Sequence, residues 1–217
     1  SVILSHDSND LDMIQNYQYK RTVSLNKPIK FGFVRGPVWN FGDEDMKHGI
    51  KEFVKNEQLD IEELELGKDF DDAAKAHEII MNGSIANSLM NYYQTDKSNL
   101  HPFTVKRIEA GIPVSASDYV SAIEQAKKME QILKQFFKKY DAIITPAAPG
   151  QAPRDLMNTG NAIFNGYWTM MGVPAISLPF LKGKDDLPIG IQFIANWSED
   201  LKLLEICKYI LKKRKAC

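Results

Sequence analysis

The chain has 217 residues, of which 44% are hydrophobic and 25% are charged, a balance that indicates a globular chain with a core of useful size. The 27 lysines and arginines nearly balance the 28 aspartates and glutamates, which argues against a general nucleic-acid binder. No apolar run approaches the roughly 20 residues that a membrane-spanning helix needs, so we expect neither nucleic acid nor a membrane as a partner.

The two cysteines indicate a reducing environment. Cys207 and Cys217 lie on one C-terminal segment, where a helix would keep them from meeting, and there is no CxxC pair for metal or redox chemistry. We therefore expect a cytoplasmic location. The chain begins at Ser1, without an initiator Met or a signal peptide, and we expect it to be a piece of a longer protein.

The first elements predict a strand–helix–strand unit. Residues 29–34 have the pattern of a buried strand, and the acidic residues 43–45 are expected to begin a helix because anions there favour the helix dipole. Apolar residues recur at helical spacing over 46–54, and a short acidic strand is expected over 61–66. This order predicts a parallel crossover unit in an α/β fold.

The middle of the chain is expected to be helical. A long helix is predicted over 69–93, and a short one over 104–110 that ends at Gly111, a usual residue just past a helix. Residues 115–118 are expected to cap a third helix that runs to about residue 139. The long helix is marked by an apolar stripe at helical spacing: Phe70, Ala74, His77, Met81, Ile85 and Leu89.

The last part of the chain predicts strands and helices in turn. A short buried strand over 141–145 stops at Pro146, and a helix is expected over 162–171. Two strands, over 175–178 and 189–195, are separated by a polar turn and are expected to pair as a hairpin.

A final helix over 199–213 is expected to bury Leu201, Leu204 and Ile210. No internal repeat and no long linker rich in proline, glycine or serine divides the chain. We therefore expect a single domain over residues 1–217, with a mixed-sheet α/β fold.

No pattern of a catalytic nucleophile is present. The chain has no G-x-S-x-G and no loop rich in glycine and serine that would supply oxyanion donors. Ser84 falls in the middle of a predicted helix and is expected to be structural. Neither cysteine has a neighbouring histidine, so both are expected to be inert.

No pattern of a metal or cofactor site is present either. The four histidines have no i, i+4 pair, and neither a P-loop nor a G-x-G-x-x-G occurs. His77 lies on the expected apolar stripe, where a core or boundary histidine is favoured over a metal ligand. We expect no metal and no cofactor.

The densest cluster of special residues runs from 145 to 197, which holds six of the ten prolines and two of the three tryptophans. Large flat side chains either fill a core or wall a substrate pocket, and composition alone favours the core. Asn165 and Thr169 are four residues apart, so on a helix they share a face and are candidate polar groups in an apolar cleft.

Segments of this cluster resemble the C-terminal signature of the amidase signature family. Residues 164–179 read FNGYWTMMGVPAISLP and residues 187–192 read LPIGIQ, similar to the family's fNxxWtxxGvPaislP and lPvGlQlig segments. Residues 145–153, TPAAPGQAP, resemble its tPxxpxxAP strand end.

Upstream segments agree with the family in order. Residues 5–10 look like the GxDpxD segment that follows the family's catalytic region, 29–36 look like its lriGvvrg strand, and 111–113 resemble the turn before its long helix. The resemblance covers essentially all 217 residues, but only the C-terminal half of a full-length family member.

The resemblance implies an α/β/α sandwich around a large mixed sheet. Family members hydrolyse carboxamides, or transfer their ammonia, through a Ser–cis-Ser–Lys triad. That triad lies in the family's N-terminal half, so no residue of this chain is assigned a catalytic role.

The resemblance also places seven residues of this chain at a substrate cleft. Two would lie at a strand end, four on the neighbouring helix and one on the strand opposite. These residues are Thr145 and Pro146, then Phe164, Asn165, Trp168 and Thr169, and finally Gln192.

Two hypotheses follow. In the first, the chain is the C-terminal part of an amidase-like hydrolase, inactive alone, whose N-terminal half is its partner and whose small amide substrate binds only in the complete enzyme. In the second, it is a non-catalytic, truncated amidase-like protein that self-associates as a homo-oligomer or binds a partner through the sheet face that the N-terminal half would cover.

Overall fold

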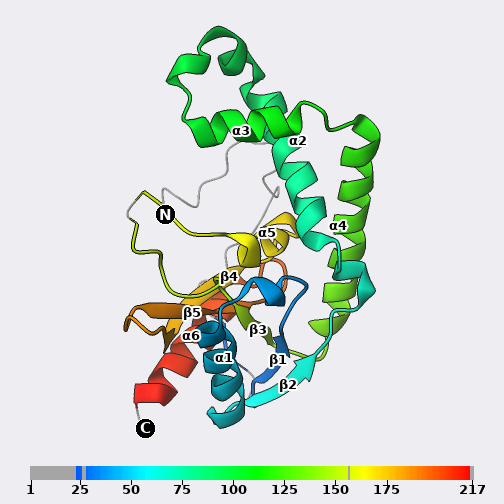
Figure 1. Cartoon of the computed structure of the whole chain (residues 1–217). Helices are drawn as coiled ribbons and strands as arrows, with labels where there is room; N and C mark the ends of the chain where they lie inside the picture. Colours follow the sequence, from blue (N-terminus) through cyan, green and yellow to red (C-terminus); the bar gives the residue numbers. More distant parts are fainter. Residues whose placement is uncertain (1–22, 26–27, 156, 216–217) are drawn as a thin grey trace.

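The structure, a computed structural model, describes residues 23–25, 28–155 and 157–215 (Figure 1). The upstream match at 5–10 and Cys217 lie outside these residues. The described chain builds one mixed sheet with helices on both sides, and a group of helices that extends away from the sheet (Figure 1).

The described strands form a five-stranded sheet in the order β2-β1-β3-β5-β4. β2 and β3 pair parallel to β1 on either side of it, whereas β5 pairs antiparallel with β3 and with β4. The strands are β1 (Lys30–Val34), β2 (Asp60–Leu64), β3 (Ala142–Pro146), β4 (Ala175–Lys182) and β5 (Pro188–Ile194). The mixed α/β sheet, the parallel crossover and the C-terminal hairpin are confirmed.

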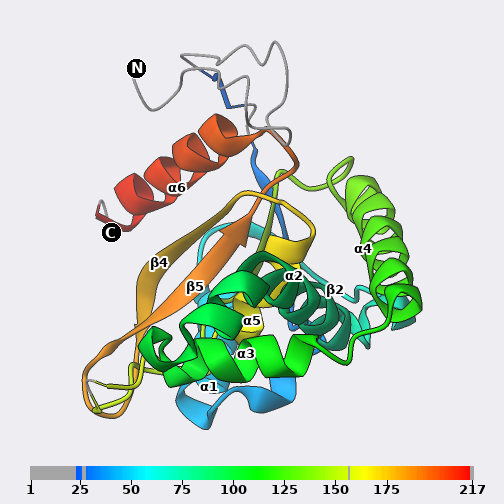
Figure 2. The same ribbon diagram turned by 90° about the horizontal axis from the view of Figure 1, so that it is seen from above.

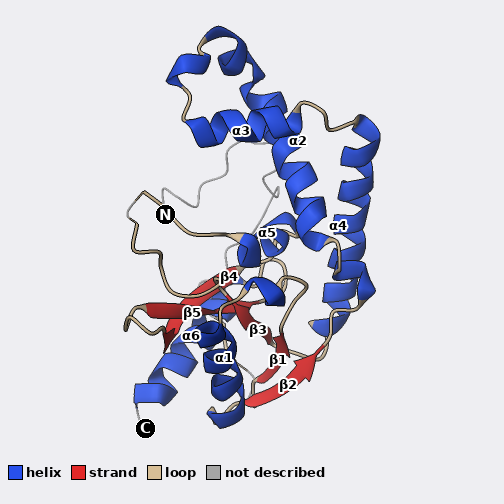
Figure 3. Cartoon of the chain, viewed as in Figure 1, coloured by secondary structure: helices blue, strands red, loops and turns tan. Residues whose placement is uncertain are grey.

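The described helices are α1 (Glu44–Asn56), α2 (Ala73–Thr95), α3 (Pro102–Gly111), α4 (Ala116–Phe136), α5 (Ile163–Met170) and α6 (Asp200–Lys215). Figures 1 and 3 show α1 and α6 on one side of the sheet and α5 with α2 on the other. Figure 2 shows α2 and α3 over the α5 side, with α4 beside them. The expected cap of α4 is confirmed, because Ser115 accepts from Asp118 N at 3.0 Å. Asp43, expected to begin α1, also caps it by accepting from Met46 N at 2.8 Å.

The long helix is present as α2, but its apolar stripe is not its most buried face. Its fully buried positions are the small or polar residues Ala73, Ala76, Asn82 and Ala86, while five of the six predicted residues are only partly buried. The exception, Phe70, precedes the helix. Because α2 contacts α3, α4 and α5, its closest contacts fall on several faces, and small residues allow that approach.

Gly111 is the last residue of α3, not the residue past its end. Its φ is not positive, so the usual conformational reason for a glycine there does not apply. A Cβ on Gly111 would collide with the carbonyl oxygen of Asn82 on α2. Close approach of α2 and α3 is therefore the physical reason for this glycine.

The stripe predicted on α6 is shifted. Leu204 is 54% exposed and Leu201 is half-buried, whereas Ile210 is buried as expected. The residues that pack against the sheet are Leu203, Ile206, Cys207 and Ile210, a spacing of i, i+3, i+4 and i+7 that defines one helix face. None of the described helices is both long and apolar enough to cross a membrane.

Candidate functional site

A cleft of about 760 Å³ opens where the chain leaves β3. We call it the β3 cleft; it is lined by residues 147–153 and 158–162, and by Asn165, Ser177, Pro188 and Gly190. The lining thus combines the two loop segments between β3 and α5, one residue of α5, and residues of the β4–β5 hairpin. A concave surface at the carboxyl end of a central strand is a usual place for a ligand in an open α/β sheet.

Two contacts hold the loop 147–153 in place. The backbone N–H of Asp43, the cap of α1, donates to the carbonyl oxygen of Pro149 at 2.7 Å. On the other side, Asp185 in the hairpin turn accepts from the side chains of Gln151 and Arg154. Those two partners hold the pKa of Asp185 below its ordinary value, Arg154 having the larger effect. The loop is therefore attached both to α1 and to the hairpin.

Thr145 and Gln192, two of the residues predicted for the site, lie side by side in the sheet. They are direct partners across the β3–β5 pair, and Gln192 is in turn the partner of Ser177 on β4. Such a row of cross-strand partners places three polar side chains on one face of the sheet. Thr145 and Gln192 are 0% and 5% exposed, while Ser177 is exposed at the cleft.

Of the seven residues predicted to wall a cleft, Asn165 lines the β3 cleft, and the other six lie outside its lining. Phe164 and Trp168 are fully buried in the core. Large aromatic side chains stabilise a fold most when their apolar surface is removed from water. Thr169 is exposed and does not share the cleft with Asn165.

Three of the predicted residues, Thr145, Pro146 and Gln192, lie in the strands next to residues that line the cleft. Pro146 and Thr145 precede the lining residue Ala147 by one and two positions, and Gln192 follows the lining residue Gly190 by two. Pro146 is itself buried, opposite Ile191 of β5. Their role in binding a substrate stays a prediction.

Four buried polar atoms gather around this row. By distance and angle, the Thr145 hydroxyl, the Tyr167 hydroxyl, the Trp168 indole N–H and the Gln192 side-chain NH₂ form no hydrogen bond with a described residue, although the Tyr167 hydroxyl lies close enough to the side chains of Thr145 and Trp168 to interact with both. Burial raises the pKa of Tyr167, and the side chains of Thr145 and Trp168 offset that shift only in part. Unpaired polar groups at such depth are rare in cores and concentrate at functional places.

Gly36 makes room for Tyr167. Its φ is +76°, which favours glycine, and a Cβ there would lie 2.5 Å from the Tyr167 hydroxyl oxygen. The glycine that ends the expected 29–36 segment therefore allows α5 to pack closely over the end of β1.

Five polar residues of the lining were not among the predicted site residues: Gln151, Asn158, Thr159, Asn161 and Ser177. Ser177 and Gly190 lie inside the two C-terminal segments that resemble the family, but nothing in the sequence says which side chains face the cleft. Asn158 and Asn161 lie in an Asn-Thr-Gly-Asn loop, whose composition is a turn signal that could have drawn attention to it.

The other nucleophilic and basic candidates are structural. The Ser84 hydroxyl forms a 3.0 Å hydrogen bond with that of Tyr119 on α4, and burial raises the pKa of the Cys207 thiol to about 12. His77 is half-buried, and burial lowers its pKa. A Cβ on Gly166 of α5 would lie 2.6 Å from its ring. His77 is thus a boundary residue, as its position on the helix indicated. Among the described residues, no group of His, Cys, Asp and Glu is arranged to hold a metal ion.

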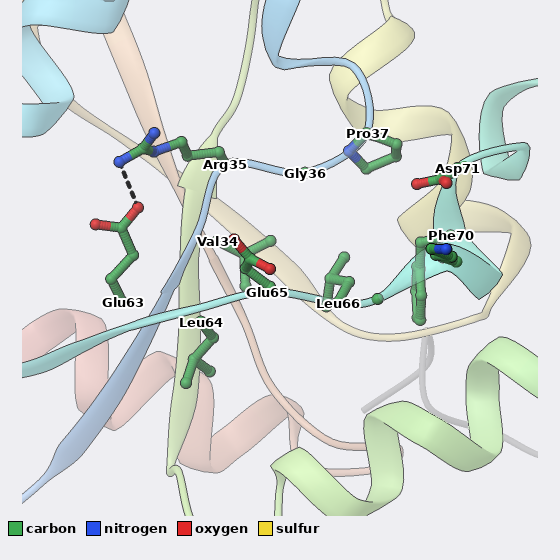
Figure 4. Close-up of a pocket in the computed structure, with 12 residues that line it drawn as sticks. Val34, Arg35, Gly36, Pro37, Glu63, Leu64, Glu65, Leu66, Phe70 and Asp71 are labelled. Carbon is green, nitrogen blue, oxygen red and sulfur yellow. Dashed lines mark ion pairs between the residues drawn. The ribbon is translucent and has the colours of Figure 1, made fainter.

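A second, smaller hollow of about 340 Å³ lies at the carboxyl ends of β1 and β2 (Figure 4). Arg35 and Glu63 form a 2.5 Å ion pair at one side of it, with about half of each side chain exposed. Figure 4 shows Asp71 and Pro37 on the opposite side. The arginine is already paired with Glu63, and the remaining lining carries Glu65, Lys68 and Asp71. We take the larger β3 cleft, which is lined in part by the segments that resemble the family, as the candidate site.

Comparison with known proteins gives a consistent result. The family model described as Amidase matches residues 1–204. A glutamyl-tRNA(Gln) amidotransferase subunit of Aliarcobacter butzleri is 34% identical over 125 residues, which cover 52% of this chain and 28% of that protein. The protein of the same name from Agathobacter rectalis is 26% identical over 249 residues, which cover 98% of this chain and 49% of that protein.

A solved structure described as "Crystal structure of amidase" superposes with a TM-score of 0.73 at 17% identity, covering 85% of this chain and 45% of the other. At that identity the likeness shows the fold alone. The chain spans about half or less of the length of the relatives that it matches. The match over residues 1–204 shows that the chain belongs to the Amidase family, that of the amidase signature enzymes.

Proposed function

We propose that the chain is the C-terminal part of an amidase-like hydrolase that acts on the carbon–nitrogen bond of carboxamides. It supplies walls of the substrate cleft, and the N-terminal half of the enzyme supplies the nucleophile, the base and the oxyanion hole. The observation that carries this proposal is the family match over residues 1–204, combined with a β3 cleft whose described lining offers hydrogen bonds but no catalytic base.

Amide hydrolysis needs more than this cleft contains. A hydroxyl nucleophile must lie within hydrogen-bond reach of a base, and oxyanion donors must face the developing charge. Ser177 is the serine of the lining, but no histidine, lysine or carboxylate is among the described residues that line the cleft with it. We therefore expect the isolated chain to be inactive.

The two edges of the sheet differ in a way that supports a missing half. On the edge strand β2, Glu62 pairs with Lys139 and Glu63 pairs with Arg35, and charges of this kind discourage further strand pairing. The edge strand β4 instead begins with Ala175–Leu178, an uncharged segment in which Ala175 and Ser177 are exposed. We expect the N-terminal half to extend the sheet at β4.

A non-catalytic module that self-associates is the second candidate. Exposed apolar side chains on α3, just after it and on α4 favour it: Phe103, Ile112 and Val120 are 59%, 53% and 54% exposed. Exposed apolar side chains grouped in one part of a molecule can mark a protein-protein contact. In either case we propose a cytoplasmic protein whose partner is an N-terminal amidase half or a second copy of the chain.

One experiment separates the two candidates. The native protein is purified, its mass is measured by light scattering, and the same sample is assayed for hydrolysis of 4-nitroacetanilide. A second chain in a complex heavier than the 24.6 kDa of this one, together with hydrolysis, supports the split enzyme. A stable, inactive homo-oligomer contradicts it and supports the non-catalytic module.

A further inference from the structure

The β3 cleft is lined without formal charge. Every described residue of its lining is apolar, a glycine, an amide or a hydroxyl residue. Beside the lining, Arg154 and Asp185 pair with each other, and Asp185 also binds Gln151. The carboxylate of Asp43, which caps α1 by accepting from Met46 N, lies against the backbone of Gly150. The described lining residues themselves thus offer a ligand neither a cation nor a carboxylate.

The amide groups of the cleft are oriented by the backbone. The side-chain oxygen of Asn158 accepts from Gly160 N at 2.9 Å, and that of Asn161 accepts from Ile163 N at 3.0 Å. With its oxygen engaged, each asparagine has its NH₂ group left as a hydrogen-bond donor. The Asn161 contact also satisfies the first N–H of α5, whose preceding residue, Ala162, provides no side-chain cap.

Two further polar groups face the cleft from opposite elements. Asn165 lies on α5 and Ser177 on β4, and both belong to the lining. Between these groups the walls are small and apolar, with alanines and prolines such as Ala147, Pro149 and Pro188. The cleft thus combines neutral hydrogen-bonding groups with short aliphatic surface.

We propose that the β3 cleft binds the uncharged, carbonyl-bearing portion of an amide substrate with a short aliphatic chain. Its asparagine NH₂ groups donate to a carbonyl oxygen, and its alanine and proline walls contact the aliphatic carbons. A free carboxylate or ammonium group on the ligand finds no opposite charge here, so moving it out of water is uncompensated. This inference rests on the proposed function, because it takes the cleft as the substrate site.

The test compares three probes of one length and different charge. The native protein, ¹⁵N-labelled, is titrated with butyramide, butyrate and butylammonium, and the amide resonances of Asn165 and Ser177 are followed by NMR. We expect saturable shifts with butyramide and affinities about threefold to tenfold weaker for both charged probes, the range that one or two hydrogen bonds supply.

A matched pair of variants makes the test sharper. Asn165→Asp places a carboxylate in the cleft with little change in shape, and we expect it to reverse the preference in favour of butylammonium. Asn87→Asp adds the same charge on the exposed surface of α2, and we expect it to keep the preference for butyramide.

The outcomes separate this inference from the proposed function. Equal or tighter binding of butyrate or butylammonium, or no shift at Asn165 and Ser177 with butyramide, would overturn the uncharged-ligand inference even if the native protein hydrolyses 4-nitroacetanilide. Selective binding of butyramide by a native protein that hydrolyses no amide would support the cleft chemistry and contradict the hydrolase.

Discussion

Thr145 on β3 and Gln192 on β5 are direct cross-strand partners, and each holds a buried polar atom that has no hydrogen-bond partner among the described residues. Burying such a group without a partner costs about 1–3 kcal/mol. The pair therefore makes the centre of the sheet less stable than an apolar pair would. Packing alone would favour aliphatic residues at these two buried positions. Both lie two residues from a residue that lines the β3 cleft.

The first prediction concerns the Thr145 hydroxyl. Thr145→Val replaces it with a methyl group of similar size, and we expect the free energy of unfolding to rise by about 1 kcal/mol because an unpaired buried group is removed. Urea unfolding followed by circular dichroism measures the change. Thr169→Val, at an exposed position of α5, is the control, expected within about 0.5 kcal/mol of the parent. A clear loss of stability in Thr145→Val would mean that the hydroxyl has a bonding partner.

The second prediction tests the observed face of α6 with two adjacent leucines. Leu203 is fully buried and Leu204 is 54% exposed. We expect Leu203→Ala to lower the free energy of unfolding by about 2–5 kcal/mol, through lost burial and the cavity left behind. Leu204→Ala is expected to change it by less than about 1 kcal/mol. Equal effects of the two variants in thermal or urea unfolding would place the helix face elsewhere.

The same pair of leucines shows why the strands were more predictable than the helix faces. The strands β1 and β3 are runs of buried apolar residues, and the hairpin is set off by a polar turn, so local pattern is enough. On α6, Leu203 and Leu204 are chemically identical, and only the packing against the sheet decides between them. On α2, contacts with three other helices produce no single stripe to detect.

The candidate site was predictable in place but not in detail. The segments that resemble the family lead to the ends of β3 and β5, where the cleft is found. Which side chains point into it depends on the pleat and on how α5 packs, so Asn165 was identified while Ser177 was not. The loop at 158–162 carries no periodicity, and only tertiary contacts bring it to the cleft.

The third prediction concerns the close approach of α2 and α3 at Gly111. Alanine favours a helix more than glycine does, by up to about 1 kcal/mol. Even so, we expect Gly111→Ala to destabilise the protein by about 1–3 kcal/mol, because its Cβ would collide with the Asn82 backbone. Gly49→Ala on α1 is the control: the nearest atoms to its Cβ would belong to the Leu181 side chain, at 3.2 Å and beyond, and not to a backbone. If Gly111→Ala were the more stable of the two in urea unfolding, the close packing of these helices would be wrong.

The fourth prediction is a dependence of stability on alkaline pH. Burial raises the pKa of Cys207 from about 9 to about 12, so the folded state holds this proton more tightly than the unfolded state. The stability that this gives is fully present below pH 9. As the pH rises from 9 to 12 the unfolded state loses the proton first, and the free energy of unfolding falls by at most about 1.4 kcal/mol per pH unit from this group.

Cys207→Ala removes the titrating thiol. We expect the variant to be less stable at pH 7, because a buried side chain is truncated, but to lose less stability than the parent between pH 9 and pH 12. Urea unfolding at pH 7, 9, 10 and 11 gives both slopes, and a Cys217→Ser background removes the other thiol from the comparison. Parallel slopes for parent and variant would show that the Cys207 thiol titrates alike in the folded and unfolded states, contrary to its burial against the sheet.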